Sequence, residues 1–424
     1  MISTDFATNE SWDDAWLSLM LLFQPCKWKS GKETQLLKEK FTDLFIKNVC
    51  LSNGRDKMVY FFLSGRAALY FLLNSLKLQP GSNVVLQAFT CEAVILPILA
   101  NYLKPIYIDI ETETFSMDYH SLINRLTDNC RVLILQHTFG LTPKFRAEIL
   151  KLAAKRNLIV IEDLAHGFNP KIFSPNNTYQ LTNNYYLLSF GRSKFISSVF
   201  GGAILSSNNL TIQPFNHVSF PSYWFIFLCL LYKPLTMLIK STYDFYIGKI
   251  LHKLLNSFNL LIPEITLKEK AGEYDKIFNK AYPNALAILL LHQLKKFEQI
   301  QKQRARICKY YSGVILNSTT LRMTERGLIR FPLLLNNRDK TLALARKSNI
   351  FLGKWYDQVV APKDLNLDSV GYKSGSCPKA EEISRKIINL PTNISEREAK
   401  KVASILDDVI SLNDVVSINQ CIDI

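Results

Sequence analysis

Short apolar segments alternate with segments of helical periodicity from residue 58 to residue 163, and this alternation constrains the fold more than any other feature of the chain. The apolar segments are nearly continuous in hydrophobic residues, as in strands that are covered on both faces. Such an alternation predicts an α/β domain built on a mostly parallel, doubly wound sheet. The predicted strands are Val59–Leu63, Val84–Phe89, Ile106–Ile110, Val132–Gln136 and Leu158–Glu162.

Composition and pattern divide the whole chain into five segments. In the last of them we expect one long helix over Asn284–Tyr311, a strand over Phe351–Tyr356 and a capped helix over Ser395–Leu412. The segments are an N-terminal arm, residues 1–57; a large domain, residues 58–214; an apolar and amphipathic insertion, residues 215–265; a connecting loop, residues 266–283; and a smaller α+β C-terminal domain, residues 284–424.

The charge of the chain indicates an anionic partner, since its 424 residues carry a formal net charge of +15. The sequence has no zinc-finger spacing, RNA-binding aromatic signature or arginine-rich arm, so we expect no contact with nucleic acid. The anionic partners that remain are a membrane surface and a phosphorylated substrate. The eight cysteines contain no C-x-x-C pair, which predicts free thiols in a reducing cytoplasm and no metal site.

Polar groups follow several predicted strands at the point where each strand ends. Ser64-Gly65-Arg66 ends one strand and opens a helix, Asp163 ends another, and Ser189 lies near the end of the apolar run Tyr185–Phe190. Lys194 follows in a loop of small residues. Each group alone has an ordinary explanation, as a helix cap or a solvated side chain. In a doubly wound sheet, however, ligands bind at the carboxyl ends of strands, where all four groups would meet.

Together these groups match the needs of pyridoxal 5′-phosphate. A lysine can hold the cofactor aldehyde as a Schiff base, and a carboxylate facing the ring nitrogen keeps that nitrogen protonated. The amide groups at the start of a helix, together with a hydroxyl group, can bind its phosphate. The sequence therefore predicts Lys194 and Asp163 as the catalytic pair.

The order of the motifs resembles the DegT/DnrJ/StrS family of sugar aminotransferases, which have the type I aminotransferase fold. The resemblance covers about residues 58–410, apart from the insertion. The motifs that carry it are Ser64–Leu69, Phe89-Thr90, Pro105–Asp109, His137–Gly140, Ile161–His166, Ser189–Lys194, Gly201-Gly202, Pro283–Leu294 and Ala380–Pro391.

The resemblance implies a role for each matching residue. Lys194 would form the Schiff base and shuttle protons, and Asp163 would pair with the ring nitrogen. Ser189 and the backbone of Gly65 and Arg66 would hold the phosphate. Two further cofactor-binding residues are implied, His166 near the ring hydroxyl and Asn279 at the phosphate of a neighbouring subunit, so a homodimer is expected. The implied substrates are a nucleotide-linked keto sugar and glutamate as amino donor.

Four positions depart from the family pattern. Cys91 replaces the aromatic residue that stacks on the cofactor ring, which leaves Phe89 as a candidate for that contact. Arg66 replaces a threonine, Phe200 a glutamate and Ala281 an arginine. None of the changes affects Lys194 or Asp163, so they bear on the identity of the substrate.

The insertion departs most strongly from the family. Its first apolar run is interrupted by Lys233-Pro234 and is too short to span a membrane, and its second half is amphipathic and basic. Two interpretations remain open: the insertion lies in a membrane interface, or it is a helical hairpin buried against the body or a partner. The first suggests a cytoplasmic enzyme peripheral to the inner face of a membrane, acting in surface-polysaccharide or glycolipid synthesis.

Two other functions remain open. One is a related reaction with the same cofactor that does not transfer an amino group, although Lys194 argues against the dehydratase branch, which carries a histidine at that position. The other is a membrane-associated homologue that has kept the fold without catalysis.

Overall fold

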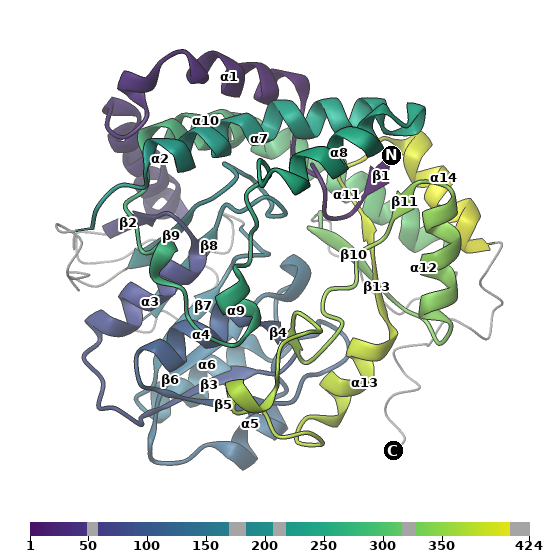
Figure 1. Cartoon of the computed structure of the whole chain (residues 1–424). Helices are drawn as coiled ribbons and strands as arrows, with labels where there is room; N and C mark the ends of the chain where they lie inside the picture. Colours follow the sequence, from purple (N-terminus) through teal and green to yellow (C-terminus); the bar gives the residue numbers. More distant parts are fainter. Residues whose placement is uncertain (49–57, 169–183, 207–217, 316–326, 408–424) are drawn as a thin grey trace.

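The computed structural model describes residues 1–48, 58–168, 184–206, 218–315 and 327–407 (Figure 1). Its centre is a seven-stranded sheet in the order β2-β9-β8-β7-β6-β3-β5. All neighbouring strands are parallel except for β9, which is antiparallel to both β2 and β8. The strands are β2 Met58–Phe62, β3 Asn83–Gln87, β5 Lys104–Ile108, β6 Cys130–Gln136, β7 Ile159–Asp163, β8 Asn184–Ser189 and β9 Gly202–Ser206.

Helices cover both faces of this sheet, so the predicted α/β class and mostly parallel sheet are confirmed. One face packs on α3, Gly65–Ser75, and α4, Glu92–Ala100; the other packs on α5, Tyr119–Arg125, and α6, Arg146–Lys155. Helix α3 begins where predicted because the Ser64 side chain accepts a hydrogen bond from the backbone N–H of Ala67.

The N-terminal arm packs against elements from distant parts of the chain. Strand β1, Ile2–Ser3, pairs with β11, Ile350–Phe351, in the C-terminal part of the chain. Helix α1, Trp12–Leu22, packs on the insertion, and α2, Lys32–Asn48, packs on α10, Asn284–Lys295 (Figure 1). The arm therefore joins elements that are far apart in the sequence. Residues 49–57 of the predicted arm lie outside the described part of the chain.

The C-terminal part is built around the antiparallel pair β10, Arg330–Leu334, and β13, Ile387–Pro391. The predicted single helix Asn284–Tyr311 is wrong, because the structure has two helices here, separated at Lys296. The Lys296 ammonium donates a hydrogen bond of 2.7 Å to the Asp14 carboxylate. The helices of the C-terminal part are α10 Asn284–Lys295, α11 Phe297–Val314, α12 Arg338–Lys347, α13 Pro378–Lys386 and α14 Glu396–Asp407.

The predicted strand Phe351–Tyr356 is also wrong beyond its first residue. Only Ile350 and Phe351 pair with β1, which is itself two residues long. The chain then turns, so that Trp355 and Tyr356 lie in a loop. The end of α14 is Asp407, and the remainder of the predicted helix Ser395–Leu412 lies outside the described residues.

The insertion forms two helices, α7, Tyr223–Thr242, and α8, Ile247–Ser257. The expected interruption at Lys233-Pro234 does not occur in the backbone, because Pro234 lies inside α7. A proline leaves the carbonyl four residues earlier without its helical hydrogen bond. Here the Ser18 hydroxyl of α1 donates to that carbonyl, on Leu230, at 2.7 Å.

The lysine beside this proline, Lys233, forms an ion pair with a carboxylate of the N-terminal arm. Lys233 is fully buried, with its ammonium 3.9 Å from the Glu10 carboxylate. Among the described residues, the segment Tyr223–Phe245 is long and apolar enough to cross a membrane by length and composition, and half of its most apolar window is buried inside the molecule. Residues 215–217 of the predicted insertion lie outside the described residues.

Candidate active site

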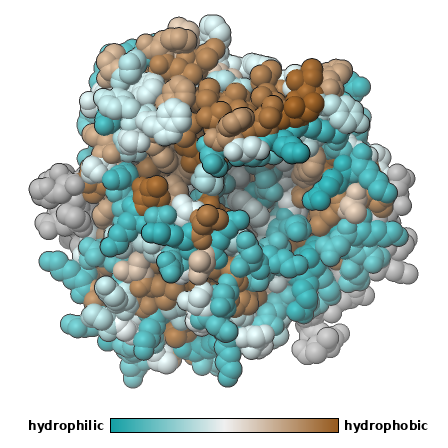
Figure 2. All heavy atoms as spheres, in the orientation of Figure 1, coloured by the Kyte–Doolittle hydropathy of each residue, from teal (hydrophilic) through white to brown (hydrophobic). Residues whose placement is uncertain are grey.

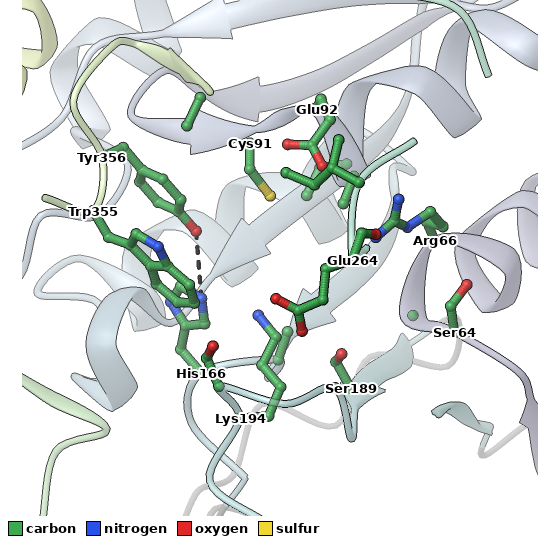
Figure 3. A pocket seen from close by; sticks show the side chains of 18 of the residues that line it. Ser64, Arg66, Cys91, Glu92, His166, Ser189, Lys194, Glu264, Trp355 and Tyr356 are labelled. Carbon is green, nitrogen blue, oxygen red and sulfur yellow. Dashed lines mark hydrogen bonds between the residues drawn. The ribbon is translucent and has the colours of Figure 1, made fainter. Parts of the chain in front are cut away.

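A cavity of about 370 Å³ opens at the carboxyl ends of β2, β7 and β8 (Figure 3). It contains the side chains of Asp163, His166, Ser189 and Lys194 and the first turn of α3. These predicted residues come from different strand ends, and the parallel arrangement brings them to one edge of the sheet. Two segments that the motifs did not predict complete the walls: the loop after β11 and the residues that follow α8.

Lys194 enters the cavity from the loop after β8, and its backbone carbonyl accepts a hydrogen bond from the Asn9 side chain. Burial lowers the pKa of the Lys194 ammonium, although Cys91, Glu264 and Asp163 act in the opposite direction. A lowered pKa increases the fraction of neutral amine, which is the form that attacks a carbonyl.

Asp163 is buried at the end of β7. Burial raises the pKa of its carboxyl, while a hydrogen bond of 2.9 Å from the Ala165 backbone N–H and the charge of Lys194 oppose this rise. A cationic group placed beside Asp163 would favour its ionised form.

The strand end that carries Asp163 is held by a buried network on its neighbour Glu162. The Glu162 carboxylate contacts the His137 ring at 2.9 Å and receives two hydrogen bonds from Arg146, at 2.8 and 2.7 Å. Burial alone would raise the pKa of Glu162, but these partners lower it to about 2. The carboxylate is therefore ionised at neutral pH, and its bonds tie β7 to β6 and α6.

The amino end of α3 lies directly against Ser189. A Cβ atom added to Gly65 would stand 3.2 Å from the Ser189 Cβ, and one added to Gly202 would stand 2.5 Å from the Gly65 nitrogen. Glycine at these positions permits the helix end and the hydroxyl to approach one another. Free amide groups and a hydroxyl form an anion seat, which we define as Gly65, Arg66 and Ser189.

The Arg66 side chain is directed toward the segment after α8. Its guanidinium forms an ion pair with the buried Glu269, donates to the Glu264 carbonyl at 2.7 Å and lies 4.8 Å from the centre of the Phe278 ring. Glu269 lies in the short helix α9, Leu267–Lys270. The backbone of Arg66 therefore belongs to the anion seat, while its side chain holds the end of the insertion through Glu264 and Glu269.

His166 lies in a stack of aromatic rings at one side of the cavity. Its ring centre is 5.1 Å from that of Trp355, and its Nε2 is 3.4 Å from the Tyr356 hydroxyl (Figure 3). Burial lowers the pKa of His166 well below its ordinary value, so the ring is neutral. Among the described residues no hydrogen-bond partner reaches its buried Nδ1.

Trp355 and Tyr356 are site residues that the sequence did not reveal. Trp355 lies 5.1 Å from the Lys194 ammonium, measured to the ring centre. Phe89, the candidate for ring stacking, is not among the residues that line the cavity, because it is buried behind Tyr356 at a ring distance of 5.3 Å. The sequence signal that could have identified this wall is the Trp-Tyr pair itself, since aromatic side chains with polar atoms are frequent at binding surfaces.

Asn279 lies outside the lining of the cavity of its own chain. Its side-chain oxygen accepts a hydrogen bond from the Tyr274 hydroxyl, just after the short helix η6, Lys276–Phe278. Its predicted role at the phosphate of another subunit stays a prediction.

The residues present fit pyridoxal 5′-phosphate. The anion seat suits its phosphate, Lys194 its aldehyde, and Asp163 the nitrogen of its ring. The unpartnered Nδ1 of His166 leaves a polar atom available to the ring hydroxyl. The fit has one unusual element, because the Glu264 carboxylate also enters the cavity (Figure 3).

A family profile matches the chain on both sides of the insertion. The profile is that of the DegT/DnrJ/EryC1/StrS aminotransferase family, and it covers residues 24–219 and 273–407. The chain belongs to this family. The two matched parts flank α7 and α8, whose residues the profile does not match.

Characterised members of the family resemble the chain over most of its length. A dTDP-4-amino-4,6-dideoxy-D-glucose transaminase of Escherichia coli is 22% identical over 93% of this chain and 92% of its own. The crystal structure of NtdA from Bacillus subtilis, with bound cofactor PMP, matches with a TM-score of 0.65 and 18% identity, covering 94% of this chain and 81% of NtdA.

A dehydratase has the same fold. The structure of E. coli GDP-4-keto-6-deoxy-D-mannose-3-dehydratase with bound hydrated PLP matches at 15% identity and a TM-score of 0.65, covering 96% of this chain and all of the other. The family profile and the transaminase relative confirm the predicted family and enzyme class, and the solved structures confirm the type I aminotransferase fold. The predicted cofactor is confirmed as well, because solved structures with this fold hold PLP or PMP.

Proposed function

We propose that this enzyme transfers an amino group from glutamate to a nucleotide-linked keto sugar, in the synthesis of a surface polysaccharide or glycolipid. The observation that carries the proposal is the convergence of Lys194, Asp163 and the anion seat on one cavity. The sugar aminotransferases among the relatives supply the substrate class.

Each residue has a role that follows from its position. The bound cofactor supplies an electron sink for the bonds at the amino-bearing carbon. Lys194 accepts and donates protons at Nζ, and its lowered pKa keeps part of the amine neutral. Asp163 holds positive charge at the ring nitrogen, and the anion seat fixes the position of the phosphate. Trp355 and Tyr356 exclude water from one side of the cavity.

The second candidate function is a reaction with the same cofactor that ends without amino transfer. The solved dehydratase with the same fold favours keeping it. Lys194 supports transamination, because that reaction uses a lysine amine in both of its halves.

Absorption spectroscopy tests the catalytic assignment. Purified protein with added PLP should show a visible band that glutamate converts, and Lys194→Ala should lose this band. Asp163→Asn should keep the fold and lower the glutamate half-reaction rate by about 100-fold or more, because it removes a charge from a preorganised site. Lys151→Ala, an exposed lysine on α6, is the control. A visible band without any response to glutamate would favour the second function, and absence of the band would contradict both.

We also propose that the enzyme is a homodimer in which Asn279 serves the partner's anion seat. Lys194→Ala and Asn279→Ala subunits would each be inactive alone. If they are mixed and reassociate at random, half of the dimers contain both kinds of subunit and one complete site, so about a quarter of the activity should return. Mixed dimers without activity would contradict the shared site.

A peripheral membrane contact is the last part of the proposal. Large apolar side chains are exposed along α1, α7 and α8, and Figure 2 shows brown atoms gathered over this region, along the upper edge of the view. We call this set the apolar face: Trp12, Trp16, Met20, Phe23, Tyr223, Trp224, Leu238, Phe245, Tyr246, Ile247, Ile250, Leu254 and Phe258.

The apolar face combines aromatic residues with nearby cations, including Lys249 and Lys253 of α8. This combination and the net charge of +15 suit an anionic lipid surface at the inner face of a membrane. The protein should sediment with anionic vesicles, and Ile250→Ser/Leu254→Ser/Phe258→Ser should not. Tyr102→Ser, at an exposed aromatic outside the apolar face, is the control. Loss of self-association in the triple variant would instead make the face an interface between copies.

A further inference from the structure

The segment after α8 places a carboxylate inside the cavity. The Glu264 side chain points toward Lys194 and Ser189 in Figure 3, and its Oε1 accepts a hydrogen bond of 3.0 Å from the Arg192 backbone N–H. A Cβ atom added to Gly191 would stand 3.3 Å from this oxygen and 3.9 Å from the Ser189 Oγ. The carboxylate therefore borders the anion seat on the side of Lys194.

The backbone of this segment is clamped on both sides. On one side the Arg66 guanidinium donates to the Glu264 carbonyl at 2.7 Å and pairs with Glu269. On the other side the Arg192 guanidinium donates to the Ile262 carbonyl and lies 4.1 Å from the centre of the Tyr232 ring in α7. The clamp leaves the side chain of Glu264 as the part that can rotate away from the seat.

A phosphate ester carries a charge of about −1.5 to −2 at neutral pH. Two anions a few ångströms apart in a partly buried site repel each other strongly, because little water screens them. The Glu264 carboxylate in this position therefore weakens the binding of a phosphate in the adjoining anion seat. Neither Glu264 nor its segment falls within the residues that the family profile matches.

We infer that Glu264 is a built-in competitor for the anion seat, and that it sets the affinity of this enzyme for the phosphate of its cofactor. Without cofactor, the carboxylate accepts the Arg192 N–H beside the seat. Binding of the phosphorylated cofactor turns the side chain away while the clamped backbone stays in place. The inference rests on the proposed function, since it requires that the cavity bind the cofactor.

The test compares two ligands that differ only in the phosphate. Dissociation constants for pyridoxal 5′-phosphate and for pyridoxal would be measured by absorbance in phosphate-free buffer. Glu264→Gln keeps an oxygen acceptor for the Arg192 N–H and removes the charge, so it should bind pyridoxal 5′-phosphate about tenfold more tightly. Its affinity for pyridoxal should change less, because for that ligand only the influence of Glu264 on the pKa of Lys194 remains. Glu273→Gln, an exposed glutamate on the following loop, changes the net charge equally and should alter neither constant.

Inorganic phosphate gives an independent readout without the cofactor. It should raise the melting temperature of Glu264→Gln at a lower concentration than it raises that of the unmodified protein. Equal affinities of the two proteins for pyridoxal 5′-phosphate would overturn the inference, as would equal tightening for pyridoxal. If neither protein binds pyridoxal 5′-phosphate, the proposed function itself fails, and the phosphate-dependent melting data still decide the role of Glu264.

Discussion

Single residues in the cavity carry charges whose state depends on burial. Glu92 opens α4, is almost completely buried and lines the cavity. Burial raises the pKa of its carboxyl from an ordinary 4.5 to about 7; the nearby Arg66 opposes the rise and Glu269 adds to it. The Glu92 carboxyl therefore exchanges its proton near neutral pH, where enzymes commonly work.

The pKa of Glu92 predicts a pH-dependent stability. The carboxyl binds its proton more tightly in the folded than in the unfolded protein, so its ionisation destabilises the fold. The effect is absent below about pH 4.5, develops as the pH rises to 7 and is complete above it. In the cofactor-free protein, Glu92→Gln should thus raise the free energy of unfolding by up to about 3 kcal/mol at about pH 8 and leave it nearly unchanged at about pH 4.

Urea unfolding of both proteins at the two pH values measures this difference. Glu148→Gln, a substitution at an exposed position in α6, should show no such dependence on pH. An equal effect of Glu92→Gln in the acidic and the alkaline buffer would contradict the shifted pKa.

At the residue scale the sequence predicted that Asp163, Ser189 and Lys194 meet at strand ends, but not the aromatic wall of Trp355 and Tyr356. Asp163 and Ser189 end buried strands, and the position of a strand end can be inferred from the local pattern. Trp355 and Tyr356 follow a strand that ends early because its partner β1 has only two residues. The length of β11 depends on a contact across almost the whole chain, which no local pattern contains.

Among the elements, α7 shows how a helix can continue through a proline. Its continuity depends on Ser18, which lies in a different helix and donates to the buried Leu230 carbonyl. From Lys233-Pro234 the sequence predicted an interruption, which the structure does not show. The sequence could not indicate the hydrogen bond from Ser18, because this donor comes from a segment more than 200 residues away.

A double-mutant cycle tests the role of Ser18. Ser18→Ala leaves the buried carbonyl unpaired and should lower the free energy of unfolding by about 1–3 kcal/mol. Pro234→Ala restores a backbone N–H that can bond to the Leu230 carbonyl, so in that background the Ser18 substitution should cost much less. Denaturant unfolding of the four proteins gives the coupling. Additive effects would show that Pro234 and Ser18 act independently.

In the whole molecule, one residue of the N-terminal arm links two helices of the C-terminal part to the loop that carries Lys194. The Asn9 amide donates to the Lys194 carbonyl, and its oxygen accepts a hydrogen bond of 2.6 Å from Arg304 in α11. Its backbone carbonyl accepts from Gln293 of α10 at 3.0 Å. None of these contacts is local in the sequence, so no local pattern in the arm could predict them.

Asn9→Ala should therefore affect stability and cofactor binding together. It removes an acceptor from the buried Arg304 guanidinium and a donor from the Lys194 loop, and truncating one partner of a buried charged group costs several kcal/mol. We expect a lower melting temperature and an affinity for pyridoxal 5′-phosphate weakened by about tenfold. Thr42→Ala, at a partly exposed position in α2, should change neither. A stable variant with unchanged affinity would contradict the link.

The pairing of β1 with β11 has a consequence for the order in which the protein is made. A ribosome adds about 5–20 residues each second, and domains generally fold as they emerge. The first strand of this chain has to wait until Ile350 and Phe351 have been synthesised before it finds its partner. Helix α1 finds its support earlier, because it packs on α7, which ends at Thr242. The two ends of the arm therefore dock at different times, α1 first and β1 last.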